Sequence, residues 1–194
     1  MQRLLLVAAL VATSGVVSPA YAAPKEPLPA LQLTSGADVW SIPYAALEQF
    51  IQDGTFSDQR LLWLVTRSGW PEADLRMALA KPYSVNYLAL SRFLNSPAGE
   101  AFLQQQTQAF KPVKASKGLG FEGLRYAILE NAKGGTISAM GILKHLPLPM
   151  AFNLAGPPIV RCSSLPCEKP EQCRSVLSWW VFLPACLQAA AMNA

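Results

Sequence analysis

Helix starts and helix stops recur through the middle of this chain, and this punctuation constrains its fold more than any other feature. Ser96-Pro97 is the clearest start, because a serine hydroxyl caps a helix and proline is favoured at the first helical position. Gly54 is a clear stop, since glycine readily adopts the left-handed conformation that follows a helix. Apolar residues fall at helical spacing between these signals. The pattern predicts an all-α fold, a compact bundle of about six or seven short helices within residues 39–156.

The expected helices follow one another with short connections. They begin near Pro43, Ser57, Pro71, Ser84, Ser96, Phe121 and Thr136. The helix after Ser57 is apolar on nearly all sides, so we expect it to be the most buried. The last helix is broken by Pro147, and residues 150–154 are compatible with either a short strand or an extended tail.

The first residues have the three parts of a secretory signal. Arg3 supplies positive charge, residues 4–17 carry no charge, and Ala20-Tyr21-Ala22 places small residues at the cleavage positions. The uncharged stretch has about 14 residues, fewer than the roughly 20 of a membrane-spanning helix, which disfavours an N-terminal anchor. We therefore expect residues 1–22 to be removed and residues 23–38 to form an extended lead-in. The mature chain is expected in a periplasm, a thylakoid lumen or the medium, with no integral membrane span.

The charge of the chain does not indicate a nucleic-acid partner. The formal net charge is +4, and it falls to +3 when Arg3 is removed with the signal. Only Lys111, Lys114 and Lys117 cluster, and no aromatic residue alternates with them as a base-stacking platform would require. A solvated basic loop is the favoured interpretation, so no nucleic acid is expected to bind.

The sequence lacks the parts of a serine hydrolase. The nucleophile of such an enzyme usually lies in a Gly-x-Ser-x-Gly turn, and this motif does not occur. His145 is the only histidine, and its place near the end of a helix favours a structural role, because a cation there interacts well with the helix dipole. A single histidine also cannot supply a histidine-rich metal site. We predict no catalytic residue, cofactor site or metal site from these patterns.

Paired carboxylates, which serve general acid–base chemistry, also have simpler explanations here. Glu72 and Asp74 fall in the first turn of an expected helix, where negative charge is favoured. Glu122 and Glu130 are each followed three residues later by a basic residue that can pair with them, Arg125 and Lys133 respectively. These carboxylates are therefore expected to be ordinary surface charges.

Residues 157–194 differ in composition from the rest of the chain. All four cysteines lie in this segment, at Cys162, Cys167, Cys173 and Cys186. An even cysteine count in an exported protein favours disulfides, with three possible pairings. Zinc ligation is the alternative, but the usual Cys-x2-Cys spacing is absent. The pattern predicts an irregular Cys/Trp-rich tail that the helical fold does not require.

The last part of this tail, residues 175–194, carries no charged side chain. Pro184 interrupts it, and its strongly apolar part is shorter than the roughly 20 residues of a membrane span. Trp179, Trp180 and Phe182 indicate either core packing or a surface that binds a partner. The abrupt change in composition is also what a shifted reading frame would produce.

Four runs of residues carry a resemblance to a known family. They are IPYAALEQF at 42–50, FLNSPAGE at 93–100, GFEGLRYA at 120–127, and ILKHLP at 142–147 followed by Phe152-Asn153-Leu154. In this order they resemble a cyanobacterial family commonly named as alpha/beta hydrolases of unknown function. The resemblance implies that, in long members of the family, this helical region precedes a separate hydrolase half. That half holds the nucleophile, the acid and the histidine. The present sequence ends before such a half.

Three functions are compatible with these observations. The favoured hypothesis is a non-catalytic helical module that binds a protein partner, either a hydrolase or an envelope protein. An esterase or lipase, as the family name implies, is the second hypothesis. The third is a carrier of an apolar ligand between helices.

Overall fold

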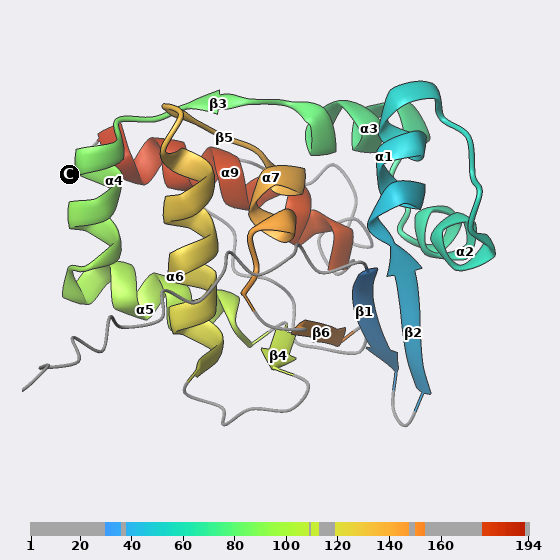
Figure 1. The fold of residues 1–194 in the computed structure, drawn as a ribbon, viewed down its shortest axis with the longest axis horizontal. Helices are drawn as coiled ribbons and strands as arrows, with labels where there is room; N and C mark the ends of the chain where they lie inside the picture. The colour runs from blue at the N-terminus through green and yellow to red at the C-terminus, as the bar shows by residue number, and fades with distance from the viewer. Residues whose placement is uncertain are drawn as a thin grey trace, which may run out of the picture.

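The computed structural model describes residues 30–35, 38–108, 110–112, 119–147, 150–153 and 176–192. In these parts of the chain, eight helices are accompanied by short strands that form two small sheets (Figure 1). The prediction of a mostly helical protein is confirmed. The expectation of an all-α fold is wrong, because a sheet joins segments that are far apart in the sequence.

The larger sheet has the strand order β2-β1-β6-β4. Strand β1 (Ala30–Ser35) pairs antiparallel with β2 (Asp38–Pro43) and parallel with β6 (Met150–Asn153), which pairs antiparallel with β4 (Phe110–Pro112). An extended lead-in was expected where β1 lies, but not its pairing. The short-strand interpretation of residues 150–154 is confirmed for β6.

Buried and less buried residues alternate along β1, and the buried ones pack this sheet against the core. Leu31 and Leu33 are buried, and the residues on either side of Leu33 are less so. Leu33 lies opposite Trp40 of β2 and Phe152 of β6, and residues directly opposite each other point to the same face. These three side chains therefore lie on the core side of the sheet, with Leu33 and Phe152 fully buried.

Three helices follow the hairpin. Helix α1 (Tyr44–Asp53) ends at Gly54, whose φ of 82° is the predicted left-handed stop. Helix α2 (Gln59–Arg67) is capped by the side chain of Asp58, one residue later than the predicted cap. Helix α3 (Glu72–Ala80) begins directly after Pro71.

The next two helices meet at the predicted Ser96-Pro97 junction. Helix α4 (Tyr87–Leu94) is capped by Asn86, and α5 (Pro97–Gln106) is capped by Ser96, with proline in its first turn. Helix α5 stops earlier than the Phe110 that the sequence predicts, because that residue belongs to strand β4.

Two predicted helix starts were wrong for a shared reason. Ser84 and Thr136 were expected to cap helices, but they pair with each other in a second sheet made of β3 (Tyr83–Ser84) and β5 (Thr136–Ile137). Helix α6 (Leu119–Ala132) precedes β5. Helix α7 (Ala139–Lys144) follows it and is capped by Ser138.

The C-terminal helix α9 (Val176–Met192) is part of the core. It contacts α3, α4 and α7, and it crosses the molecule behind α6 and α7 in Figure 1. Leu183 and Leu187 are buried in the same cluster as the residues of the other helices. The expectation of an irregular tail is therefore wrong for this segment, and that of a dispensable tail stays a prediction. Among the described helices, none is long and apolar enough to span a membrane.

Candidate functional site

Helix α2 presents the most distinctive exposed surface in the described parts of the chain. Its inner side buries Leu61, Leu64 and Val65. The residues on its outer side fall three and four positions apart and are exposed, so they form one face. We call this surface the α2 face, which consists of Gln59, Leu62, Trp63, Thr66 and Arg67. The prediction that this helix would be the most buried is wrong, since the Leu62 and Trp63 residues are each 39% exposed.

Trp63 is held between two neighbours. The ring of Trp40 meets it edge to face, with 4.6 Å between the ring centroids. The guanidinium carbon of Arg67 lies 5.2 Å from the centroid of the Trp63 ring, within the range of a cation–π contact. Because Trp40 lies opposite the buried Leu33, this stack connects the surface of α2 to the sheet and its core.

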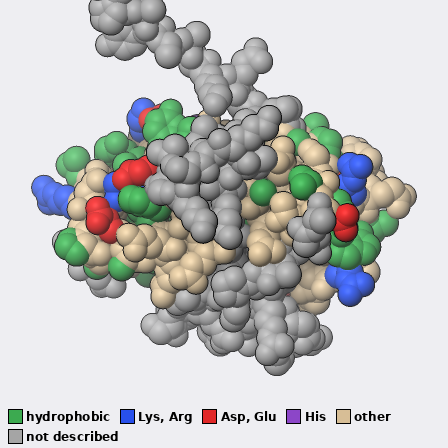
Figure 2. All heavy atoms as spheres, turned by 90° about the horizontal axis from the view of Figure 1, so that it is seen from below, with side chains coloured by type: hydrophobic (Ala, Val, Ile, Leu, Met, Phe, Trp, Pro, Cys, Tyr) green, Lys and Arg blue, Asp and Glu red, His purple; other side chains and the backbone are tan. Residues whose placement is uncertain are grey.

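The α2 face lines a shallow hollow of about 340 Å³. Leu62 and Trp63 supply apolar surface there, whereas Gln59 and Arg67 supply side-chain hydrogen-bond donors. Figure 2 shows hydrophobic side chains at the surface beside Lys and Arg side chains, at the end of the molecule where Figure 1 places α2 and β2. A surface of this kind can bind a ligand that has both an apolar and a polar part.

Helix α2 is cationic as well as aromatic. It carries Arg60 and Arg67 and no acidic residue. The Nη1 atom of Arg60 donates a hydrogen bond to the carbonyl oxygen of Ser41 in β2, at 3.1 Å. Asp58, which directly precedes the helix, accepts hydrogen bonds from the backbone amides of Arg60 and Leu61.

The single histidine and its nearest capping serine lie at opposite ends of α7. The Ser138 hydroxyl accepts a hydrogen bond from the backbone amide of Gly141, and the Nδ1 atom of His145 lies 2.7 Å from the carbonyl oxygen of that residue. The Cα atoms of the two residues are separated by roughly 10 Å along the helix, at about 1.5 Å per residue, and each side chain hydrogen-bonds to the backbone of Gly141. A nucleophile and its base need to be within about 3 Å, so these two side chains are not arranged as a catalytic pair.

The carboxylates that the sequence singled out lie as predicted. Glu122 pairs with Arg125 at 2.9 Å, and Glu130 pairs with Lys133 at 2.7 Å. The Glu130 carboxylate raises the pKa of Lys133 through their hydrogen bond. The other two acidic residues, Glu72 and Asp74, lie exposed in the first turn of α3. Within the described residues, no group of His, Cys, Asp and Glu is placed to hold a metal ion.

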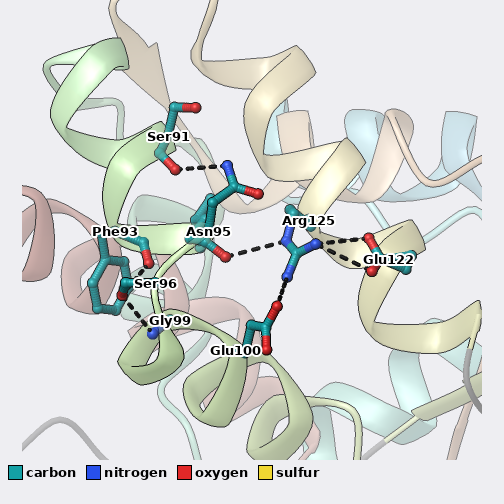
Figure 3. A network of polar contacts seen from close by, with 9 residues as sticks. Ser91, Phe93, Asn95, Ser96, Gly99, Glu100, Glu122 and Arg125 are labelled. Atoms are coloured by element: carbon teal, nitrogen blue, oxygen red, sulfur yellow. Dashed lines mark hydrogen bonds and ion pairs between the residues drawn. The ribbon is translucent and has the colours of Figure 1, made fainter.

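Arg125 is the centre of a polar cluster between α4, α5 and α6 (Figure 3). It donates to the carbonyl oxygen of Leu94 and to the carboxylates of Glu100 and Glu122. Two of the four family-like runs, at 93–100 and 120–127, therefore meet at this side chain. With only 14% of its side chain exposed and its donors used by the protein, Arg125 has a structural role.

The predicted tail residues have different outcomes. Phe182 is 7% exposed and its ring lies 5.8 Å from that of Trp70, which corresponds to the core-packing interpretation. Cys186 is also buried. The side chains of Trp179 and Trp180, and the residues Cys162, Cys167 and Cys173, lie outside the described parts, so disulfide pairing stays a prediction.

The sequence interpretation missed Trp40, Trp63 and Arg67. A signal was present, because Gln59, Thr66 and Arg67 are polar residues at helical spacing from Trp63. This pattern marks the side that carries Trp63 as a solvent-facing one. The contribution of Trp40 could not be found in this way, since it depends on how the hairpin packs against α2.

Comparison with known proteins gives one match. Residues 30–153 match the family described as alpha/beta hydrolase of unknown function. The match begins with β1 and ends with β6, so it includes both strands of the parallel pair. No curated protein and no solved structure matches the chain.

Proposed function

We propose that this chain, which belongs to the family of alpha/beta hydrolases of unknown function, is an exported helical module that binds a protein partner and does not itself catalyse hydrolysis. The observation that carries the proposal is the α2 face, where Trp63 is 39% exposed although it is braced by Trp40 and Arg67. Tryptophan and arginine are among the residues enriched at the positions that dominate binding energy at protein interfaces.

The arrangement of the family-like region supports this role. Trp40, which contacts Trp63, belongs to the β1–β2 hairpin, and β1 pairs with β6. Residues distant in the sequence therefore fix the position of the α2 face. A surface held rigidly before binding loses less side-chain entropy when a partner docks. The secretory signal in residues 1–22 supports export, and an intact mass that begins at Ala23 would test it.

Site-specific photo-crosslinking in the native cell tests partner binding. A photoreactive phenylalanine analogue replaces Leu62, in the α2 face, or Leu88, a control residue on α4 that is 64% exposed. We expect a discrete protein adduct from position 62 and none from position 88. Equal adducts at both positions, or no protein adduct at position 62, would contradict the proposal.

A hydrolase is the second candidate, and the family description is what favours it. Ser138 and His145 are the candidate nucleophile and base for such an activity, and both cap α7. An ester-hydrolysis assay, described in the Discussion, separates this candidate from the first.

A further inference from the structure

The cations of α2 have no carboxylate partner in the described parts of the chain. The ion pairs found there use Arg125, Lys133 and Lys144. Arg67 instead lies over the Trp63 ring, and Arg60 binds a backbone carbonyl. A guanidinium binds a carboxylate through two parallel hydrogen bonds, so an acidic group is the natural ligand of the exposed Arg67.

The residues around the hollow beside Arg67 indicate what can accompany this carboxylate. The hollow is open and shallow, with a volume of about 340 Å³. Its apolar surface comes from Leu62 and Trp63, and the Arg67 guanidinium lies over the Trp63 ring. The hollow therefore suits an apolar side chain that lies close to an acidic one.

We infer that the α2 face binds an acidic segment of a protein partner, with a carboxylate on Arg67 and a neighbouring apolar side chain against Leu62 and Trp63. This inference rests on the proposed function and names the chemistry of the partner. A two-fold contact between the α2 faces of two copies is disfavoured because it would bring Arg67 of each copy to the same interface. A membrane surface is disfavoured because two partly exposed apolar side chains give little insertion.

Fluorescence anisotropy with labelled peptides tests this inference on the full mature chain. The probe is a short peptide that alternates glutamate with phenylalanine and leucine. The comparison peptides replace each glutamate by glutamine or by lysine. We expect the glutamate peptide to bind most tightly, and its binding to weaken as salt shortens the Debye length from about 10 Å at 0.1 M to about 3 Å at 1 M.

Two variants locate the charge that matters. Arg67→Gln should weaken binding of the glutamate peptide up to about tenfold, because solvent screens an exposed guanidinium–carboxylate pair even when it is joined by two hydrogen bonds. Arg92→Gln removes the same charge from an exposed position on α4 and should leave binding unchanged. Both positions are exposed, so neither substitution is expected to disturb folding.

The outcomes separate this inference from the proposed function. If the glutamine peptide binds as tightly as the glutamate peptide, or the two variants behave alike, the acidic partner is wrong. A protein adduct at position 62 in the cell would then still support binding at the α2 face. Binding to phosphatidylglycerol vesicles but to no peptide also overturns the acidic segment. If no peptide binds and position 62 gives no protein adduct in the cell, both proposals fail.

Discussion

The Nε atom of Arg125 donates a hydrogen bond to the carbonyl oxygen of Leu94, which is 3.1 Å away in space and 31 residues earlier in the chain. Leu94 is the last residue of α4, so this bond satisfies a carbonyl group that the helix itself leaves without a partner. The same guanidinium also reaches Glu100 of α5 and Glu122 of α6 (Figure 3). One side chain thus fixes how three helices meet.

Arg125→Gln should lower the free energy of unfolding by roughly 1.5–3 kcal/mol, mainly through loss of the charged hydrogen bond to Leu94. Urea unfolding followed by circular dichroism measures this change. Glu100→Gln should cost less than about 1 kcal/mol, because the Glu100 side chain is 51% exposed and surface ion pairs contribute little. Equal losses in the two variants would contradict the role given to the Leu94 contact.

Gly99→Ala should destabilise the protein by at least about 2 kcal/mol, through overpacking at the junction of α4 and α5. An added Cβ atom would lie 1.9 Å from the carbonyl oxygen of Phe93, so the backbone would have to move. The matched control is Gly134→Ala, where nothing lies within 4 Å of the added atom. Thermal unfolding should show a clear loss only for Gly99→Ala, and tolerance of both changes would disprove this packing.

Tyr44→Phe should lower stability by about 1 kcal/mol at neutral pH, because the Tyr44 hydroxyl donates to the carbonyl oxygen of Leu143 at 3.0 Å. Burial raises the pKa of Tyr44 above its usual value near 10, so the folded state favours the neutral phenol. The stability that this group confers is complete below pH 10 and falls as the pH rises further.

Denaturant unfolding at pH 8 and pH 11 tests the sign of this effect. The wild type should lose more stability between these pH values than Tyr44→Phe does. Tyr126→Phe, at a residue that is 51% exposed, should behave like the wild type. An identical loss in the wild type and Tyr44→Phe would show that Tyr44 does not contribute to alkaline unfolding.

Leu187→Ala should cost about 2–5 kcal/mol, the usual loss for a buried leucine truncated to alanine. Leu187 of α9 is fully buried, whereas Met192 at the end of the same helix is 73% exposed. Met192→Ala should therefore stay within about 0.5 kcal/mol of the wild type. If removal of residues 176–194 left the thermal transition unchanged, the assignment of α9 to the core would be wrong.

The mature chain should not hydrolyse short- or medium-chain nitrophenyl esters above the buffer rate. A serine nucleophile needs a base within hydrogen-bond reach, and His145 and Ser138 lie at opposite ends of α7. His145→Ala and Ser138→Ala should give the same background rate as the wild type. Turnover in the wild type that either substitution abolishes would restore the hydrolase hypothesis.

Most of the helical structure could be read from the sequence because its signals are local. Ser96 caps α5 through a bond to the amide of Gly99, three residues away, and Gly54 adopts its left-handed conformation to end α1. The pairing of Glu122 with Arg125 was also predictable from their spacing. Each of these features depends on residues within one turn of each other.

The sheets and the contact between Trp40 and Trp63 depended on packing that no local pattern encodes. Leu33 meets Phe152 across β1 and β6, and Ser84 pairs with Thr136, so two expected helix caps became strand residues instead. The apolar composition of α2 predicted a buried helix, whereas its Leu62 and Trp63 side chains are partly exposed. Only the packing of the hairpin against α2 brings Trp40 to Trp63. The position of Trp40 is set by the pairing of β2 with β1, where it lies opposite the buried Leu33, and no pattern within α2 records that pairing.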